Sequence, residues 1–243
     1  MTETEDVKSP YNFPEGEVIL IDKPYKWSSF DVVKKIRYTI KHHIGIKKIK
    51  VGHAGTLDPL ATGLLILCTG KFTKRIDEYQ AQEKEYTGIF TLGATTPSFD
   101  LESEVDQKYE TEHLTETLIH ATTKQFIGEQ DQIPPIFSAI KIDGKRAYKY
   151  ARKNEDVVIL PKQINILEFE ITKINLPDIN FRIVCSKGTY IRSLARDFGK
   201  ALNSGAYLSE LIRTRIGDFK LSDATDVNSF QNKLMKLKSE NTS

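Results

Sequence analysis

The chain has 243 residues, of which 39% are hydrophobic and 28% are charged, and its 35 Lys and Arg residues nearly balance its 33 Asp and Glu residues. This composition is ordinary for a soluble globular protein and excludes a collagen-like, coiled-coil or wholly disordered chain. A chain of this length can form one large domain or two small ones, and it can bury a sizeable core without a disulfide or a structural metal.

In chain order, the first predicted elements are a polar arm, a strand and a helix. Residues 1–16 form the arm, and its start lacks the apolar core of a secretory signal. The apolar run over 18–21 is typical of a short buried strand. Ser28 and Asp31 form a capping-box pattern, and apolar residues then recur at helical spacing, which predicts a helix over 29–42.

A loop that contains three glycines is expected next, over 44–58. Asp58 followed by Pro59 is typical of a helix N-cap with proline at the first helical position. The run over 63–68 is the longest strongly apolar one. It is far shorter than the roughly 20 residues that cross a bilayer, so we expect no membrane segment.

The remaining predicted elements are strands over 86–92, 157–160, 164–174 and 179–185, helices over 114–127, 145–152 and 190–202, a strand pair around 206–221, and an amphipathic helix over 227–237. Strands and helices mix without strict βαβ alternation. We therefore expect an α+β fold with a mixed, mostly antiparallel central sheet and flanking helices. One domain is expected over 17–221, followed by a short helical tail over 222–243.

The two cysteines, Cys68 and Cys185, each end an apolar, strand-like stretch. Buried free thiols are common at such positions, and two cysteines do not suggest a disulfide framework. We therefore expect a protein of the reducing cytoplasm.

The near-neutral net charge of +2 conceals an uneven distribution. Seven Lys and Arg and no carboxylate occur over 32–57, further basic segments lie over 141–153 and 182–196, and acidic residues gather over 100–116. If the basic segments share one face, the protein carries a phosphate-binding surface of the kind that nucleic-acid binders use. The alternative is a set of unrelated solvated helix faces.

Common cofactor and metal motifs are absent from the sequence. It contains no Gly-x-Gly-x-x-Gly, His-Glu-x-x-His, Cys-x-x-Cys or Gly-x-Ser-x-Gly pattern, and its five histidines are not spaced as metal ligands with any cysteine pair. We therefore expect no cofactor and no metal, so that any catalysis must use ordinary side chains.

The segment GHAGTLDPLATGLL, residues 52–65, is the most unusual in the chain because glycines and threonines surround the lone carboxylate of Asp58. A carboxylate beside an arginine stays ionised and can act as a nucleophile or a positioned base. Each candidate residue also has a structural alternative: Asp58 as an N-cap, Tyr86 in a strand core, Arg192 on a solvated helix, and His53 as a hydrogen-bonding loop residue.

This segment resembles the signature of the tRNA pseudouridine synthases of the TruB type. Five further segments resemble that family in the same order, at 21–37, 84–100, 134–152, 185–199 and 205–219. Together they cover about residues 17 to 220. The resemblance implies a pseudouridine synthase fold and a cytoplasmic, monomeric enzyme whose partner is tRNA.

The implied reaction converts the T-loop uridine at position 55 of tRNA to pseudouridine, with no cofactor. The glycosidic bond breaks, the base rotates, and C1′ is rejoined to C5, after the base has been flipped out of its stack at a cost of a few kcal/mol. Two alternatives stay open: a tRNA-binding or folding protein in which catalysis is dispensable, and a pseudouridine synthase that acts on other RNA sites.

The resemblance also implies roles for individual residues. Asp58 corresponds to the catalytic aspartate, which acts on the ribose or on the base, and Arg192 to the arginine that pairs with it. Tyr86 corresponds to the tyrosine that stacks on the target base and is the candidate for removing the C5 proton. Further implied contacts are Leu211 in an apolar pocket, His53 near the extruded nucleotides, and Lys23 and Lys74 at the RNA or the active site.

Five positions depart from the family pattern, among them Ser28, which stands where the family has Thr. Lys26 stands where the family has glycine, Pro97 where it has Asp, Phe137 where it has Tyr, and Ile212 where it often has Arg. Only about 20 residues follow the last matching segment, whereas many members carry a C-terminal RNA-binding domain of PUA type. We therefore expect RNA affinity to depend on the catalytic domain or on a partner.

Overall fold

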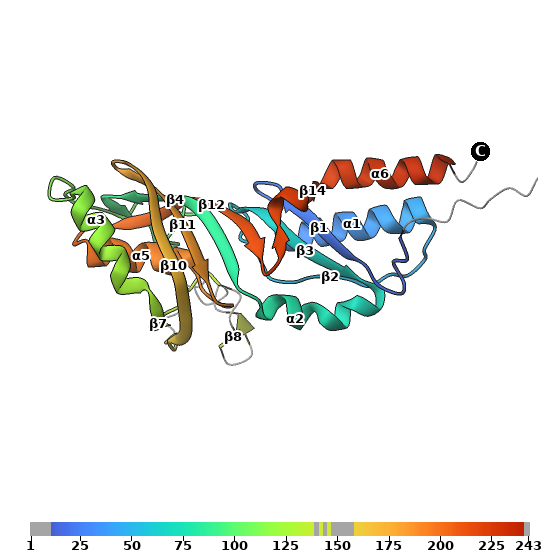
Figure 1. Cartoon of the computed structure of the whole chain (residues 1–243), viewed down its shortest axis with the longest axis horizontal. Coiled ribbons are helices and arrows are strands. Elements are labelled where there is room, and N and C mark those ends of the chain that lie inside the picture. The colour runs from blue at the N-terminus through green and yellow to red at the C-terminus, as the bar shows by residue number, and fades with distance from the viewer. Residues whose placement is uncertain (1–10, 139–140, 143–144, 147–157, 241–243) are drawn as a thin grey trace, which may run out of the picture. The chain divides into compact units, whose positions relative to one another are not determined.

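The computed structural model describes residues 11–138, 141–142, 145–146 and 158–240 (Figure 1). It divides into two compact units, each of which is described by itself below. Unit 1 comprises Met1–Gln82 and Ile212–Ser243, and unit 2 comprises Glu83–Leu211. One strand, β12 (Ala206–Ile216), contributes residues to both units.

Unit 1 contains a mixed sheet in the order β14-β1-β3-β12, with β2 paired to β3 and β13 paired to β12. β1 and β3 are antiparallel, whereas β14 is parallel to β1, and β12 is parallel to β3. The elements are β1 (Val18–Lys23), α1 (Ser29–Ile44), β2 (Val51–His53), β3 (Thr62–Thr69), the 3-10 helix η1 (Gly70–Arg75), α2 (Ile76–Ala81), β13 (Phe219–Lys220), the 3-10 helix η3 (Leu221–Asp223), β14 (Thr225–Asp226) and α6 (Val227–Glu240).

The central strand β3 contributes side chains to the hydrophobic core on both faces of the unit 1 sheet. Leu65 and Leu67 point to the face that α1 and α6 cover, and Leu64 and Ile66 point to the opposite face, where Tyr79 of α2 packs. Figure 1 shows α1 and α6 side by side on one side of these strands and α2 on the other. Because both faces of β3 are buried, its sequence is a continuous apolar run.

The helix predicted over 29–42 is confirmed as α1. Its capping box is present, since the Asp31 backbone N–H donates to Ser28 Oγ and the Ser28 backbone N–H donates to Asp31 Oδ2, both at 3.1 Å. The helix ends at Gly45, which adopts a left-handed conformation with φ of 77°.

The loop expected over 44–58 contains a short strand, β2, and the N-cap interpretation of Asp58 is wrong. No helix follows Asp58; its carbonyl instead accepts a hydrogen bond from the Ala61 N–H at 3.1 Å in a tight turn, and β3 begins at Thr62. An Asp-Pro pair can start a helix or form a turn. Here the apolar run that follows is too short for a buried helix and fits a central strand, so the pair forms a turn.

Unit 2 is built on a sheet in the order β12-β4-β11-β10-β7, in which β4, β11, β10 and β7 pair antiparallel. Five phenylalanines, Phe90, Phe126, Phe169, Phe181 and Phe198, form its aromatic core. The elements are β4 (Lys84–Leu92), β5 (Ala94–Thr95), β6 (Gln107–Lys108), α3 (Glu116–Thr123), the 3-10 helix η2 (Lys124–Phe126), β7 (Gly128–Gln132), β8 (Lys141–Ile142), β9 (Lys145–Arg146), β10 (Lys162–Asn175), β11 (Asp178–Cys185) and α5 (Ile191–Ala201).

Most elements predicted for this part of the chain are confirmed, including the strands over 86–92, 164–174 and 179–185 and the helix over 190–202. The helix over 114–127 is shorter, because Thr115 is its N-cap and its last turn is the 3-10 helix η2. Residues 158–160 are not a strand. The prediction of a helix over 145–152 is wrong at its first two residues, which form strand β9, and the remaining residues lie outside the described ranges.

Both cysteines are buried as free thiols. Burial raises the pKa of Cys68 to about 11 and that of Cys185 to about 12. The strands and helices together confirm the α+β class with a mostly antiparallel sheet and flanking helices. Within the described ranges, every helix is too short or too polar to span a membrane.

Candidate active site

The turn that carries Asp58 is fixed by hydrogen bonds to the start of α1. The Leu57 N–H donates to Ser29 Oγ at 2.8 Å, and this hydroxyl donates to the Leu57 carbonyl at 3.2 Å. The Lys26 N–H donates to the Pro59 carbonyl at 2.8 Å. The backbone on both sides of the half-buried Asp58 is therefore held in place, as a positioned carboxylate requires.

Lys26, one of the departures from the family pattern, adopts the left-handed conformation with φ of 65°. Glycine takes this conformation without steric cost, whereas another residue there costs about 1 kcal/mol. The turn therefore holds a lysine in a conformation that favours glycine, and the lysine side chain lies exposed beside the Asp58 loop.

Lys23, at the end of β1, lies completely buried near Asp58. Its ammonium group donates to the carbonyls of Trp27 at 2.6 Å, Pro24 at 3.0 Å and Pro59 at 3.3 Å. Burial lowers the pKa of Lys23 to about 8, although the negative charge of Asp58 acts in the opposite direction. Lys23 therefore supplies a positive charge beside the carboxylate and also holds the turn.

This lowered pKa predicts an unusual pH dependence of stability. Between about pH 8 and pH 10.5 the unfolded chain keeps the Lys23 proton while the folded chain loses it, so the free energy of unfolding rises with pH. Relative to Lys23→Met, the wild type should gain about 2–3 kcal/mol across this window. Urea unfolding of both proteins at pH 7.5 and pH 10.5 measures the gain; equal pH dependence in the two proteins would contradict it.

Arg213, which the sequence analysis did not select, is the largest fully buried side chain of the described residues. It extends from β12, and its guanidinium group donates to the Leu64 carbonyl at 2.8 Å and the Gly55 carbonyl at 3.2 Å. It thereby ties the segment before Asp58 to β3. Gly63 passes so close to the Arg213 backbone that a side chain there would overlap it.

His53 and Lys74 complete the predicted residues of unit 1. His53 ends β2 and is half-buried; burial lowers its pKa, a hydrogen bond with the Gly55 backbone opposes this, and the charge of Arg213 adds to the lowering. Lys74 lies exposed in η1. Their contacts with RNA stay predictions.

Tyr86 and Leu211 lie in unit 2 on adjacent strands, β4 and β12, and each is 8% exposed. The two strands approach closely at Gly88, where any side chain would overlap the carbonyl of Glu210. Tyr86 lies two residues before this glycine, and Leu211 directly follows Glu210. Their roles at the target base stay predictions.

Arg192 lies in the first turn of α5 and is nearly completely buried. Its guanidinium group forms an ion pair with Asp100 at 3.5 Å and donates to the carbonyls of Ser98 at 3.2 Å and Phe137 at 3.0 Å. The solvated-helix alternative for Arg192 is therefore wrong. Its pairing with Asp58 would join the two units and stays a prediction.

Asp100 is a second residue that the sequence analysis did not select. It is 4% exposed, and its carboxylate accepts hydrogen bonds from the Ser98 hydroxyl at 2.5 Å and the Glu102 N–H at 2.9 Å. It is therefore held rigidly while it pairs with Arg192.

Three departures from the family pattern leave these contacts intact. Pro97 is exposed in the loop before Asp100. Phe137 contacts Arg192 through its backbone carbonyl, which does not depend on the side chain. Ile212 pairs with Thr62 through the backbone of β12 and β3.

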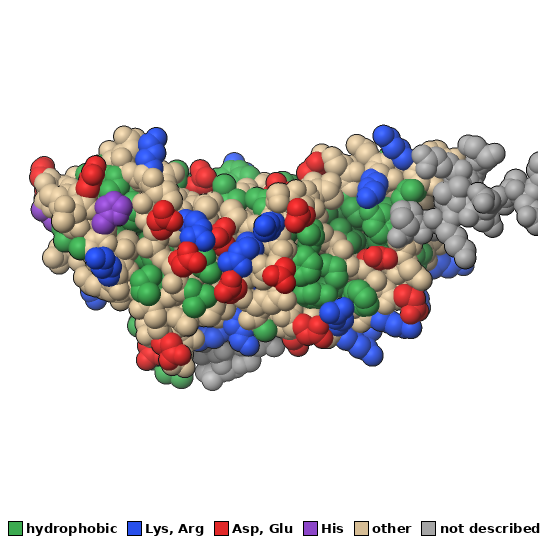
Figure 2. All heavy atoms as spheres, in the orientation of Figure 1, with side chains coloured by type: hydrophobic (Ala, Val, Ile, Leu, Met, Phe, Trp, Pro, Cys, Tyr) green, Lys and Arg blue, Asp and Glu red, His purple; other side chains and the backbone are tan. Residues whose placement is uncertain are grey.

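The third basic segment of the sequence does not form a continuous basic surface. Arg182 forms ion pairs with Glu85 at 2.8 Å and with Glu168, and Arg196 pairs with Asp197 at 2.8 Å. Figure 2 shows basic and acidic side chains mixed on the face in view. Most of the second segment, 141–153, lies outside the described residues. The first segment, on and after α1, is therefore the candidate phosphate-binding surface that the structure describes.

Within the described residues, no group of three or more His, Cys, Asp or Glu side chains is arranged to hold a metal ion. The structure instead brings Asp58 and Lys23 together near Arg213 in unit 1, and Arg192 and Asp100 together in unit 2. These groups are suited to charge stabilisation and proton transfer.

Comparisons with known proteins place these residues in a family. A family model described as TruB family pseudouridylate synthase (N terminal domain) matches residues 41–191. A protein named tRNA pseudouridine synthase B from Flavobacterium johnsoniae is 61% identical over 227 residues, covering 93% of this chain and 99% of that protein. Its namesake from Phocaeicola vulgatus is 62% identical over 219 residues, covering 90% and 93%.

A solved structure supports the same relationship. A chain in the crystal structure of a Cbf5-Nop10-Gar1 complex matches with a TM-score of 0.71 and 29% identity, covering 94% of this chain and 57% of that chain. The matching family model spans more than half of the chain, and the relatives share most of its length. The protein therefore belongs to the TruB family of pseudouridylate synthases.

Proposed function

We propose that this protein acts in the cytoplasm on tRNA and converts the T-loop uridine at position 55 to pseudouridine. The observation that carries the proposal is the fixed turn that holds Asp58 beside the buried Lys23, within the segment that resembles the family signature. The relatives named tRNA pseudouridine synthase B, which match over nearly their whole length, support tRNA as the substrate.

The proposed chemistry exchanges one bond for another within a single nucleotide. The N1–C1′ bond of uridine breaks, the base rotates, a C5–C1′ bond forms, and the C5 proton is lost while N1 gains one. Asp58, kept ionised, acts on the ribose or the base. Tyr86 stacks on the base and is the candidate for accepting the C5 proton, and Arg192, held by Asp100, orients Asp58.

The target base must leave its stack before it can reach Asp58, which costs a few kcal/mol. Phosphate contacts offset this cost because they supply binding energy that does not depend on the flipped base. The exposed lysines that follow α1, at positions 47, 48 and 50, are placed for such contacts.

Sequencing of pseudouridine positions tests the proposal directly. A tRNA transcript that carries no modifications is incubated with the purified protein, and every pseudouridine is then mapped. Complete conversion at position 55 and at no other uridine is expected. Conversion elsewhere would identify a synthase with a different RNA site, and binding without any conversion would identify an RNA-binding protein.

Neutralising Lys47, Lys48 and Lys50 together to alanine should weaken tRNA binding and lower its dependence on salt. Each lost phosphate contact reduces the slope of log K against log salt by about 0.7–0.9, so the slope should fall by about 2–3. Fluorescence anisotropy from 50 to 300 mM salt measures the slope. An unchanged slope would place these lysines away from the RNA.

A further inference from the structure

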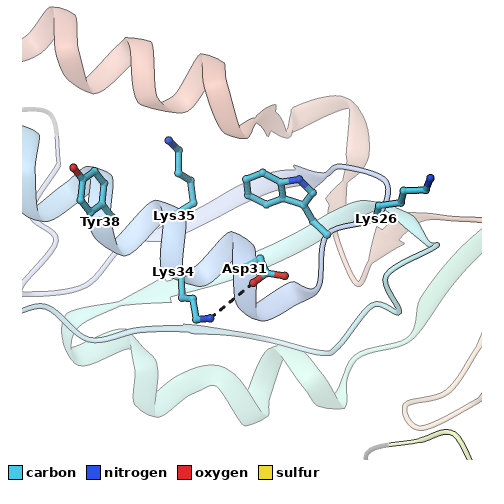
Figure 3. A pocket seen from close by; sticks show the side chains of 6 residues that line it. Lys26, Asp31, Lys34, Lys35 and Tyr38 are labelled. Atoms are coloured by element: carbon cyan, nitrogen blue, oxygen red, sulfur yellow. Dashed lines mark ion pairs between the residues drawn. The ribbon is translucent and has the colours of Figure 1, made fainter.

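A pocket of about 580 Å³ opens on the outer face of unit 1, along the first half of α1 (Figure 3). Its lining residues come from α1 and from the turn before it, and they are Lys26, Trp27, Asp31, Lys34, Lys35 and Tyr38. Figure 3 shows the labelled side chains following the helix from Lys26 to Tyr38. Lys34 and Lys35 belong to the basic segment over 32–57, and none of the six side chains takes part in the proposed breaking and forming of bonds.

The pocket is basic. Three lysines face one carboxylate, Asp31, which gives a formal charge of +2. Asp31 is already used in the structure, because it closes the capping box with Ser28 and lies 3.9 Å from the Lys34 ammonium group. An anion in the pocket would therefore meet a net positive charge.

Aromatic rings accompany these lysines. Trp27 packs its inner side against the core of unit 1, which holds the ring in place. Tyr38 is 55% exposed and rests on the ring of His42, with ring centroids 4.0 Å apart. Large exposed aromatic side chains beside lysines are the combination that binds single-stranded nucleic acid, because bases stack on the rings while phosphates contact the ammonium groups.

The pocket adjoins the Asp58 turn through the backbone. The Lys26 N–H donates to the Pro59 carbonyl at 2.8 Å, and the Trp27 carbonyl accepts a hydrogen bond from Lys23 at 2.6 Å. The residues that begin the pocket are therefore the ones that hold the catalytic turn. The end of the pocket at Lys26 and Trp27 therefore lies next to the Asp58 turn.

We propose that the pocket binds a short stretch of the substrate strand that adjoins the target uridine, with one base stacked against Trp27, another against Tyr38 about three helical turns away, and the phosphates on Lys26, Lys34 and Lys35. The inference rests on the proposed function, since its ligand is the same RNA. An acidic peptide would satisfy the lysines but would leave the two aromatic faces without stacking partners, so the aromatic lining favours RNA.

Trp27 provides a direct readout because it is the single tryptophan of the chain. Unmodified tRNA transcript is titrated into the full-length protein while the tryptophan emission and its quenching by acrylamide are followed. We expect saturable quenching with the same Kd as anisotropy gives, together with protection from acrylamide. Unchanged emission and unchanged acrylamide access at saturating tRNA would overturn the proposal.

Variants separate stacking from charge. Tyr38→Ala should raise Kd roughly 10-fold, whereas Tyr38→Phe keeps the ring and should bind as the wild type does. The pair Lys34→Ala and Lys35→Ala should lower the salt slope by about 1–2. The matched control replaces two exposed lysines of unit 2, Lys124 and Lys173, with alanine and should leave the slope unchanged.

The outcomes distinguish this proposal from the proposed function. Quenching by tRNA without pseudouridine formation would support RNA binding in the pocket and refute the proposed conversion of uridine to pseudouridine. Wild-type Kd and salt slope in all the pocket variants, with normal pseudouridine formation, would refute the pocket alone. Equal protection of Trp27 by polyglutamate at the same salt would show that the pocket selects charge rather than nucleotides, and would also overturn the proposal.

Discussion

Replacing Asp58 by asparagine should abolish pseudouridine formation, with a loss of at least about 10⁴-fold in kcat, because removing a residue that forms or breaks bonds typically costs this much. Asparagine keeps the size of the side chain and the backbone of the turn, but it cannot carry the negative charge. Tritium release from tRNA labelled at C5 of uridine measures the loss. Affinity for tRNA, measured by anisotropy, should change little.

The matched control is Asp77→Asn, the same chemical change at an exposed position of α2 in the same unit. It should retain full activity. Full activity in Asp58→Asn would refute the catalytic role of this carboxylate. If Asp58→Asn restored growth of cells that lack the gene while forming no pseudouridine, tRNA folding rather than catalysis would be the function that matters to the cell.

Replacing Asp100 by alanine should have the largest effect on stability. It removes the carboxylate that pairs with the buried Arg192, and breaking a buried pair by truncating one partner costs about 3–5 kcal/mol. Activity should fall about 10- to 100-fold in the fraction that stays folded, as is typical when the group that orients a catalytic side chain is lost. Urea unfolding and tritium release give the two values.

Two further variants separate charge from shape at this position. Asp100→Asn keeps an oxygen that can accept the hydrogen bonds from Ser98 and Glu102, so its stability should fall between those of the alanine variant and the wild type. Asp106→Ala removes an exposed carboxylate that contacts Thr95 in the same loop region, and should cost less than about 1 kcal/mol. Equal stability of Asp100→Ala and Asp106→Ala would refute a structural role for the buried ion pair.

Elements whose signals are local could be predicted from the sequence. The helix α1 follows from its capping box and from apolar residues at helical spacing, and both lie within the helix itself. The turn at Asp58 could not be predicted in the same way, because aspartate before proline suits a helix start and a turn equally. The turn forms because the residues after it pair with β1 and β12 as the buried strand β3, and those partners are distant in the sequence.

The residues of the candidate site also differ in whether the sequence alone could identify them. Asp58, Tyr86 and Arg192 came from segments that resemble a known family. Asp100 and Arg213 had no such signal, because their partners are distant in the sequence: Arg213 contacts the carbonyl of Gly55, 158 positions away. A buried arginine bound to backbone carbonyls leaves no local pattern, although the glycine that lies against it at position 63 is visible in the sequence.

The burial of both cysteines also has a practical consequence. The thiolate is the form of cysteine that attacks alkylating reagents, and the raised pKa values of Cys68 and Cys185 keep that form scarce at neutral pH. A single cysteine introduced on an exposed part of α1 should therefore be the site that a maleimide dye labels in the folded protein, with both native cysteines retained. Distances from such a dye to a labelled tRNA could then be followed during turnover.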